Sequence, residues 1–178
     1  MTDIQKAAPA ADDAIRRVLS ANVEDFEKKD AMGMAVVGFV VASLNLAFAL
    51  LMIWRSEDSG GAMWLAPMFN TVAILGLSFL VTQHVRPAGI VLISVVSAAF
   101  VANIVANFLG EAVSYPGLGL TLLVAIFVLG KMYPGLGALK TLDKGERAGA
   151  TKVLQPVFLV WGALAVLNLL VSPVLAVR

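Results

Sequence analysis

Five long apolar stretches, separated by shorter polar segments, account for most of this chain. They cover approximately residues 32–54, 62–83, 88–110, 112–133 and 153–176. Each is close to the ~20 residues that an α-helix, rising about 1.5 Å per residue, needs to cross a ~30 Å hydrocarbon layer. Because lipid offers the backbone no hydrogen-bond partner, and the stretches are uniformly apolar rather than alternating, they are expected to be helices and not barrel strands. The pattern predicts an all-α, polytopic integral membrane protein built as a bundle of five transmembrane helices.

The fourth stretch is the least regular of the five. Its continuous apolar core runs from Gly117 to Gly130, between two copies of a Tyr-Pro-Gly-Leu-Gly segment that begin at Tyr115 and Tyr133. The copies begin 18 residues apart, or roughly 27 Å of helix, so they bracket the span at its two ends. Proline suits the first turn of a helix and also stops one, so the span is expected to end at the second copy. A re-entrant or tilted short helix is the alternative for this segment.

The polar N-terminal segment, residues 1–30, has a pattern of its own. From Asp12 onwards apolar residues recur at helical spacing, and charged residues occupy the positions between them. The apolar positions are Ile15, Val18, Leu19, Val23 and Phe26. This pattern predicts an amphipathic helix over about residues 12–29, in a cytoplasmic segment that precedes a transmembrane domain of residues 31–178.

The apolar face of this helix is a candidate partner-docking face. Three interpretations are open: it docks on a partner protein or on the protein's own inner loops, it lies on the lipid leaflet, or the segment is a disordered tail. Residues 1–30 hold seven acidic and five basic residues. This balance weakens attraction to anionic headgroups, which favour cationic faces, so docking on protein is the favoured interpretation.

The numbers of basic residues between the apolar stretches predict how the chain is threaded. The N-terminal segment and the fourth loop each hold five lysines and arginines, the first and second loops and the C-terminus one each, and the third loop none. Alternate segments therefore carry eleven basic residues on the side of the N-terminus and two on the other. Cytoplasmic loops are enriched in lysine and arginine. The N-terminus is expected in the cytoplasm and the C-terminus on the opposite side of a plasma or inner membrane.

Polar side chains inside the predicted spans form a candidate polar layer. Its members are Asn45, Asn70, Asn103, Asn107, Thr121 and Asn168. Counted at about 1.5 Å per residue, most of them share a level roughly 10–14 Å below the outer boundary. An unpaired amide in hydrocarbon is unfavourable, so these side chains are expected to face one another, a cavity or a partner. Two interpretations are open: interhelical hydrogen bonds, each worth about 0.6–2 kcal/mol, or a polar site for a small neutral solute, a cation or a cofactor headgroup.

The third stretch carries a candidate helix-packing stripe of small residues. Ser94, Ala98, Ala102, Ala106 and Gly110 recur at every fourth position. Small residues at this spacing let two helix backbones approach closely in a membrane. The stripe predicts contact with another helix, either within the chain or between chains.

Composition narrows the chemistry further. Cysteine is absent and His84 is the only histidine, so no haem, zinc or iron–sulfur site is expected from this chain alone. His84 is interpreted as a solvated side chain at the membrane interface, with ligation of a single pigment or proton relay as the alternative. No phosphate loop, nucleophile elbow or dinucleotide fingerprint is present, so the chain is not expected to be an enzyme. The formal net charge of +1 does not point to nucleic acid, and no such partner is expected.

Three features favour a role in binding other proteins. The helices lack reactive groups, the third stretch carries a small-residue stripe, and the polar segments lie on the predicted cytoplasmic side. The chain is expected to be an accessory or scaffolding subunit of a larger membrane protein complex, in contact with the bilayer and with other subunits or copies of itself. The alternative is a small-solute channel or facilitator that uses the asparagines of the polar layer.

Overall fold

The structure is a bundle of α-helices. The computed structural model describes residues 4–55, 65–109, 115–143 and 149–175. The elements of these ranges are α1 (Ile4–Arg55), α2 (Leu65–Thr82), α3 (Arg86–Leu109), α4 (Tyr115–Leu142) and α5 (Gly149–Leu175). The prediction of an all-α fold is confirmed, and α1, α3, α4 and α5 each contain a segment long and apolar enough to cross a membrane. Apolar α2 is shorter, with 18 residues, or about 27 Å of helix.

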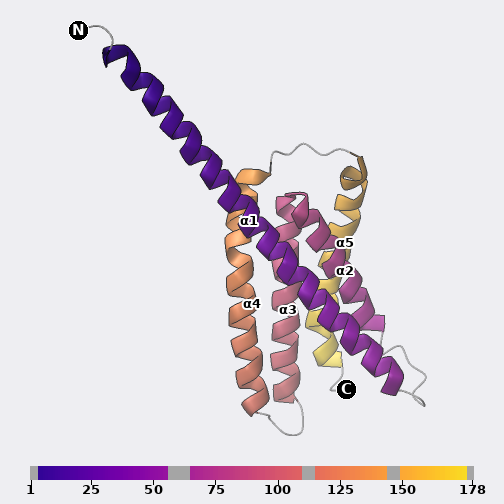
Figure 1. Cartoon of the computed structure of the whole chain (residues 1–178). Helices are drawn as coiled ribbons and strands as arrows, with labels where there is room; N and C mark the ends of the chain where they lie inside the picture. Colours follow the sequence, from indigo (N-terminus) through magenta and orange to yellow (C-terminus); the bar gives the residue numbers. More distant parts are fainter. Residues whose placement is uncertain (1–3, 56–64, 110–114, 144–148, 176–178) are drawn as a thin grey trace.

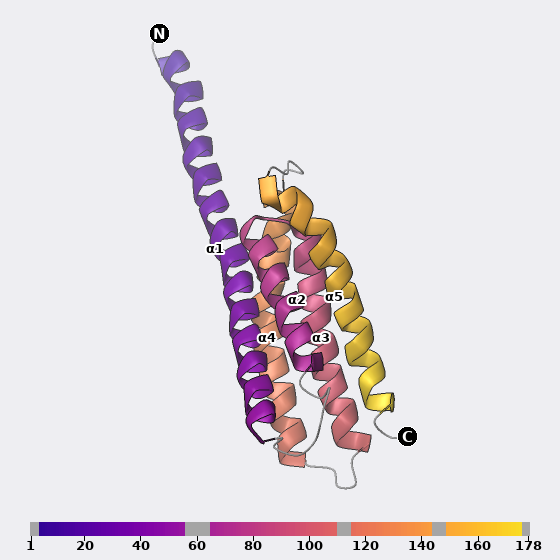
Figure 2. The same cartoon turned by 90° about the vertical axis from the view of Figure 1, so that its right-hand side faces the viewer.

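The helices pack in two layers. Helices α4, α3 and α5 lie side by side, and α1 and α2 pack across them (Figures 1 and 2). Helix α1 packs on α2 and α4 and barely touches α3, whereas α2 also packs on α3 and α5. Successive helices alternate in direction, so the N-terminal part of α1, the turn from α2 to α3 and the end of α4 lie at the same end of the bundle (Figure 1).

Helix α1 is a single helix of 52 residues, or about 78 Å. The sequence predicted a separate amphipathic helix that ends near residue 29 and a span that starts near residue 32, but the helix has no break between them. The lysines, alanine and methionines of residues 28–34 have high helix propensity and outnumber Asp30 and Gly33, whose propensity is low. The N-terminal half of α1 therefore projects beyond the bundle as a continuation of the part that packs within it (Figures 1 and 2).

Helix α2 ends in a tight turn built around His84, which has a φ of 56°. The amide of Val85 donates to the Leu80 carbonyl at 3.1 Å, and the amide of His84 donates to the Val81 carbonyl at 2.9 Å. These are the two hydrogen bonds of a Schellman motif, with His84 at the left-handed position that glycine usually occupies. Val85 and Leu80, at the two positions where this motif usually carries apolar residues, are both fully buried. His84 therefore has a structural role in this turn.

A hydrogen bond joins the start of α3 to the end of α4. The backbone amide of Arg86 donates to Asp143 Oδ2 at 2.9 Å. The first amides of a helix lack partners within the helix, and a carboxylate satisfies one of them while also favouring the positive end of the helix dipole. Asp143 thus ties together two connections that are far apart in the sequence.

Helix α4 continues through Pro134 as far as Leu142, so the prediction that the second Tyr-Pro-Gly-Leu-Gly copy ends this helix is wrong. Proline removes one hydrogen bond to the carbonyl four residues earlier. The helix persists because the residues beyond the proline pack into the bundle: Gly135, Ala138 and Leu139 are buried. The first copy behaves as expected, with Pro116 in the first turn of α4.

Small residues let the helices approach closely where they cross, as is common in membrane bundles. A Cβ atom added to Gly135 of α4 would lie 2.8 Å from the backbone oxygen of Asp30 and 2.5 Å from Met34 Cβ, both on α1. Glycines at the other crossings face side chains in the same way: Gly38 faces Ser78, Gly76 faces Phe158, Gly89 faces Leu139, and Gly162 faces Val91. The core between the two layers is filled by side chains such as Ile74, Leu77, Leu92 and Val95, all fully buried.

Candidate functional site: the projecting helix and the lipid-facing cavities

The apolar face of the projecting part of α1 is uncovered. Val18, Leu19, Val23 and Phe26 are 61%, 58%, 56% and 69% exposed. Ile15 belongs to α1, but its side chain lies outside the described part of the structure. Within that part, side chains 16–26 are all exposed, so none of the described residues covers Val18, Leu19, Val23 or Phe26 of the docking face.

The small-residue stripe of α3 does not lie on one buried face. Ala98 is buried and Ala102 half-buried, whereas Ser94 and Ala106 are exposed, and Gly110 lies outside the described residues. Residues four apart in a helix of 3.6 residues per turn differ in direction by about 40°, so the stripe rotates by roughly 120° between Ser94 and Ala106. Among the described residues of the stripe, Ala98 in its middle is the one that is buried in the bundle.

Three polar residues of α2 are buried in the bundle. Asn70 and Thr71 are 7% and 3% exposed, and Ser78 is fully buried. Thr71 donates its hydroxyl to the Pro67 carbonyl at 2.8 Å. Asn70 Oδ1 and Ser78 Oγ have no hydrogen-bond partner among the described residues. Of the predicted polar layer, Asn70 is therefore the member that is enclosed between helices.

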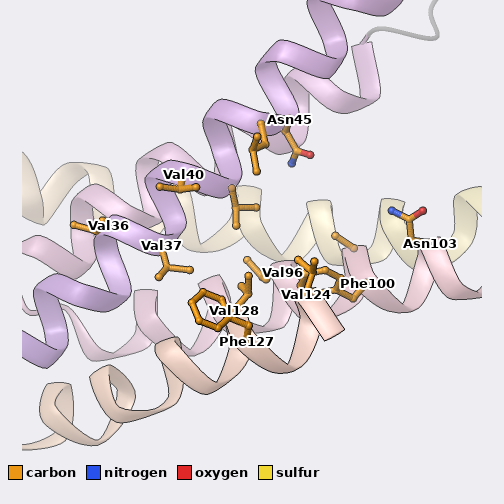
Figure 3. Close-up of a pocket in the computed structure, with 13 residues that line it drawn as sticks. Val36, Val37, Val40, Asn45, Val96, Phe100, Asn103, Val124, Phe127 and Val128 are labelled. Atoms are coloured by element: carbon orange, nitrogen blue, oxygen red, sulfur yellow. The ribbon is translucent and has the colours of Figure 1, made fainter. Parts of the chain in front are cut away.

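Asn45 and Asn103 line one cavity of about 360 Å³ between α1, α3 and α4. Both asparagines lie toward the same end of this cavity, Asn45 on α1 and Asn103 on α3 (Figure 3). The remaining walls are apolar, formed by Val36, Val37, Val40, Val41, Leu44, Val96, Ala99, Phe100, Val124, Phe127 and Val128. Several of these side chains are exposed on the outside of the bundle, so the cavity opens toward the surface that lipid would cover.

Asn168 lines a different cavity, of about 700 Å³, between α2 and α5. Its walls include Phe69 and Trp161, whose ring centroids are 5.4 Å apart. The Trp161 Nε1 atom is buried without a hydrogen-bond partner among the described residues. Three members of the predicted layer thus line two separate cavities, and Asn70 lines neither of them.

The last two members of the layer contribute little to either cavity. Asn107 donates from Nδ2 to the Asn103 carbonyl at 3.0 Å, one turn earlier on the same helix. Thr121 is half-buried on α4 and does not line either cavity. Cavities with apolar walls and one or two amides suit an apolar or neutral occupant rather than acid–base chemistry.

A third cavity, of about 750 Å³, lies between α1 and α4 near the end of the bundle from which α1 projects, and sequence reasoning missed it. Its lining includes Lys29, Asp30 and Lys131, beside Gly33 and Gly130. The sequence does contain a signal for it: Lys29 and Lys131 each lie near the end of an apolar stretch, and both ends are predicted on the cytoplasmic side of the membrane. Their proximity depends on the crossing of α1 and α4.

Across the described part of the chain, no group of three or more histidine, aspartate and glutamate residues is arranged to hold a metal ion. No protein-family model matches the chain, and no curated protein or solved structure matches it.

Proposed function

We propose that the chain is an accessory or scaffolding subunit of a larger membrane assembly, which it joins through the projecting N-terminal half of α1. The supporting observation is the uncovered apolar face of that half, with Phe26 69% exposed. A lone helix in water is only marginally stable, and most helices in proteins are stabilised by packing of an apolar face. Burial of each large apolar side chain in a partner would contribute about 1.5–3 kcal/mol.

A protein partner suits this face better than a lipid leaflet. A helix that binds a leaflet lies in the plane of the interface, whereas this segment continues the axis of a helix that packs within the bundle (Figure 2). The charges beside the face have both signs, with Arg16 and Arg17 at one end and Glu24, Asp25 and Glu27 further along. We infer a partner subunit with an apolar surface on the side of the membrane that holds the N-terminus.

We infer further that all five helices cross the membrane and that the N-terminus is cytosolic. The length of α2, about 27 Å, is close to the ~30 Å hydrocarbon thickness. The alternating direction of the helices (Figure 1) and the eleven basic residues on the side of the N-terminus, against two on the other, support this threading.

Cysteine labelling tests the threading directly, because the chain has no cysteine of its own. In intact cells or right-side-out vesicles, Ser59→Cys is expected to react with a membrane-impermeant maleimide added outside. Lys144→Cys is expected to react only after the membrane is permeabilised. The opposite pattern, or the same pattern for both variants, would contradict five crossings with a cytosolic N-terminus.

Serine substitutions test the docking face. A variant with Val18→Ser, Leu19→Ser, Val23→Ser and Phe26→Ser is expected to lose the polypeptides that co-purify with the wild-type chain in mild detergent. Loss of even two contributions of about 1.5–3 kcal/mol corresponds to roughly 100-fold or more in affinity. Quantitative mass spectrometry of the purified particles measures the change.

The control for this experiment uses the opposite face of the same helix. The control variant carries Arg17→Ser, Glu24→Ser and Lys28→Ser. The replaced side chains are also exposed, and the apolar face is retained. This variant is expected to keep its partners, since the one described ion pair, between Lys28 and Glu24, is exposed and such pairs contribute little. A wild-type chain that purifies as a single polypeptide would refute the proposal.

The channel alternative has narrower support. Asn45 and Asn103 share a cavity, as a polar path would require. Asn168 lines another cavity, between α2 and α5, which shares no lining residue with the first. The role of subunit is therefore the better-supported proposal.

A further inference from the structure

Two cavities lie next to each other along the contact between α1 and α4, and together they are called the groove. The cavity at the end of the bundle and the deeper cavity with Asn45 and Asn103 share two lining residues, Val37 and Phe127. The first cavity contains charged side chains, and the second has almost entirely apolar walls (Figure 3). The groove therefore leads from a charged mouth into an apolar interior.

Two glycines, one on each helix, keep the groove open near its mouth. Gly33 of α1 and Gly130 of α4 both line it and are both exposed. A Cβ atom added to either would meet no atom within 4 Å outside its own stretch of helix. Unlike Gly135, which brings the two helices together, these glycines leave space between them.

Two lysines, Lys29 and Lys131, supply positive charge at the mouth. The neighbouring Lys28 is instead paired with Glu24 at 2.9 Å, and the hydrogen bond and negative charge of Glu24 raise the pKa of Lys28. Lys29 and Lys131 form no ion pair within the described residues, and Lys131 Nζ lies 6.0 Å from the centroid of the Phe127 ring. With the carboxylate of Asp30, the mouth has a net charge of +1.

The apolar part of the groove has the length of one leaflet. From Gly33 to Leu44, α1 rises about 16 Å, and half of a ~30 Å hydrocarbon layer is about 15 Å. Gly33, Val37, Val40 and Leu44 recur every three or four residues along α1, so they lie on one face of that helix. Val40 and Leu44 are 53% and 66% exposed.

We propose that this groove binds an anionic glycerophospholipid, with its phosphate between Lys29 and Lys131 and one acyl chain along the apolar wall. A phospholipid of charge −1 neutralises the net charge of the mouth, and long lysine side chains at helix ends place their ammonium groups at the headgroup level. This inference goes beyond the role of subunit, because the groove lies on a different segment of α1 from the docking face.

Lipid binding is testable with the purified full-length chain. After delipidation in detergent, addition of dioleoylphosphatidylglycerol is expected to raise the Tm and to give a one-lipid adduct in native mass spectrometry. Two control ligands are added at the same concentration: dioleoylphosphatidylcholine, a zwitterionic lipid, and inorganic phosphate. Neither is expected to reproduce the effect, since the first lacks net charge and the second lacks the acyl chain.

Two variants separate the acyl and phosphate parts of the site. Gly33→Leu with Gly130→Leu fills the groove and is expected to abolish the adduct, whereas Gly119→Leu, also on α4 and in open space, is expected to keep it. Lys29→Gln with Lys131→Gln is expected to lower the preference for phosphatidylglycerol over phosphatidylcholine by about 30-fold, from roughly fivefold per lysine near an anionic headgroup.

Three results would overturn the proposal. One is equal binding of the two phospholipids by the wild-type chain. This measurement does not depend on the folding of any variant. Another is an adduct that survives in the glycine variant. The third is loss of a polypeptide rather than a lipid from that variant, which would assign the groove to a partner subunit. Failure of the serine variant on the docking face to lose partners would leave these measurements unaffected.

Discussion

Replacement of Gly135 by alanine is expected to destabilise the bundle by about 2 kcal/mol, within the ~1–3 kcal/mol range of overpacked interiors. The new Cβ would lie 2.8 Å from the backbone oxygen of Asp30. Because this oxygen belongs to the backbone of α1, it cannot move aside as the end of a side chain can, so α1 and α4 must separate. Thermal unfolding of the purified chain in detergent is expected to show a Tm lower by roughly 4–8 °C.

Gly137→Ala is the matched control for this prediction. Gly137 lies two residues further along the same helix and is exposed, and a Cβ at this position would meet nothing within 4 Å. Both substitutions gain about 1 kcal/mol of helix propensity, so the difference between the two Tm values reports the contact with α1. Equal Tm values for the two variants would show that α1 and α4 do not cross at Gly135.

The helical fold could be predicted from the sequence because a run of about 20 apolar residues in lipid has few alternatives to a helix. The third stretch, predicted at residues 88–110, corresponds to α3 from Arg86 to Leu109. Local sequence patterns were less informative about where a helix ends, because packing against other helices decides it. Pro134 resembles a stop signal, yet α4 continues because Leu139, one turn later, is fully buried.

The depth of a residue in a span can be counted along the sequence, but its direction around the helix axis cannot. Asn45, Asn103 and Asn168 were expected at one level, and the crossing of the helices decides that the first two share a cavity while the third lines another. The mouth of the α1–α4 groove was missed for the same reason. Lys29 and Lys131 are 102 positions apart in the sequence, and only the crossing brings them to one cavity.

Replacement of Gly76 by leucine is expected to have an effect as large as any single substitution in the bundle, about 3 kcal/mol of lost stability. A side chain at Gly76 of α2 would overlap the ring of Phe158 on α5. This ring is also stacked on Trp161, with centroids 6.1 Å apart, so it cannot rotate away without loss of that contact. The Tm in detergent is expected to fall by roughly 6–12 °C.

A compensating substitution distinguishes this specific overlap from general damage to α2. Phe158→Ala alone leaves a cavity and is expected to destabilise by about 3 kcal/mol. In the double variant, the leucine at position 76 fills part of the space that the ring vacates, so the combined loss is expected to be smaller than the sum by about 1–3 kcal/mol, as for residues in direct contact. Losses that simply add would show that Gly76 and Phe158 are not in contact, and the packing of α2 on α5 would have to be reassigned.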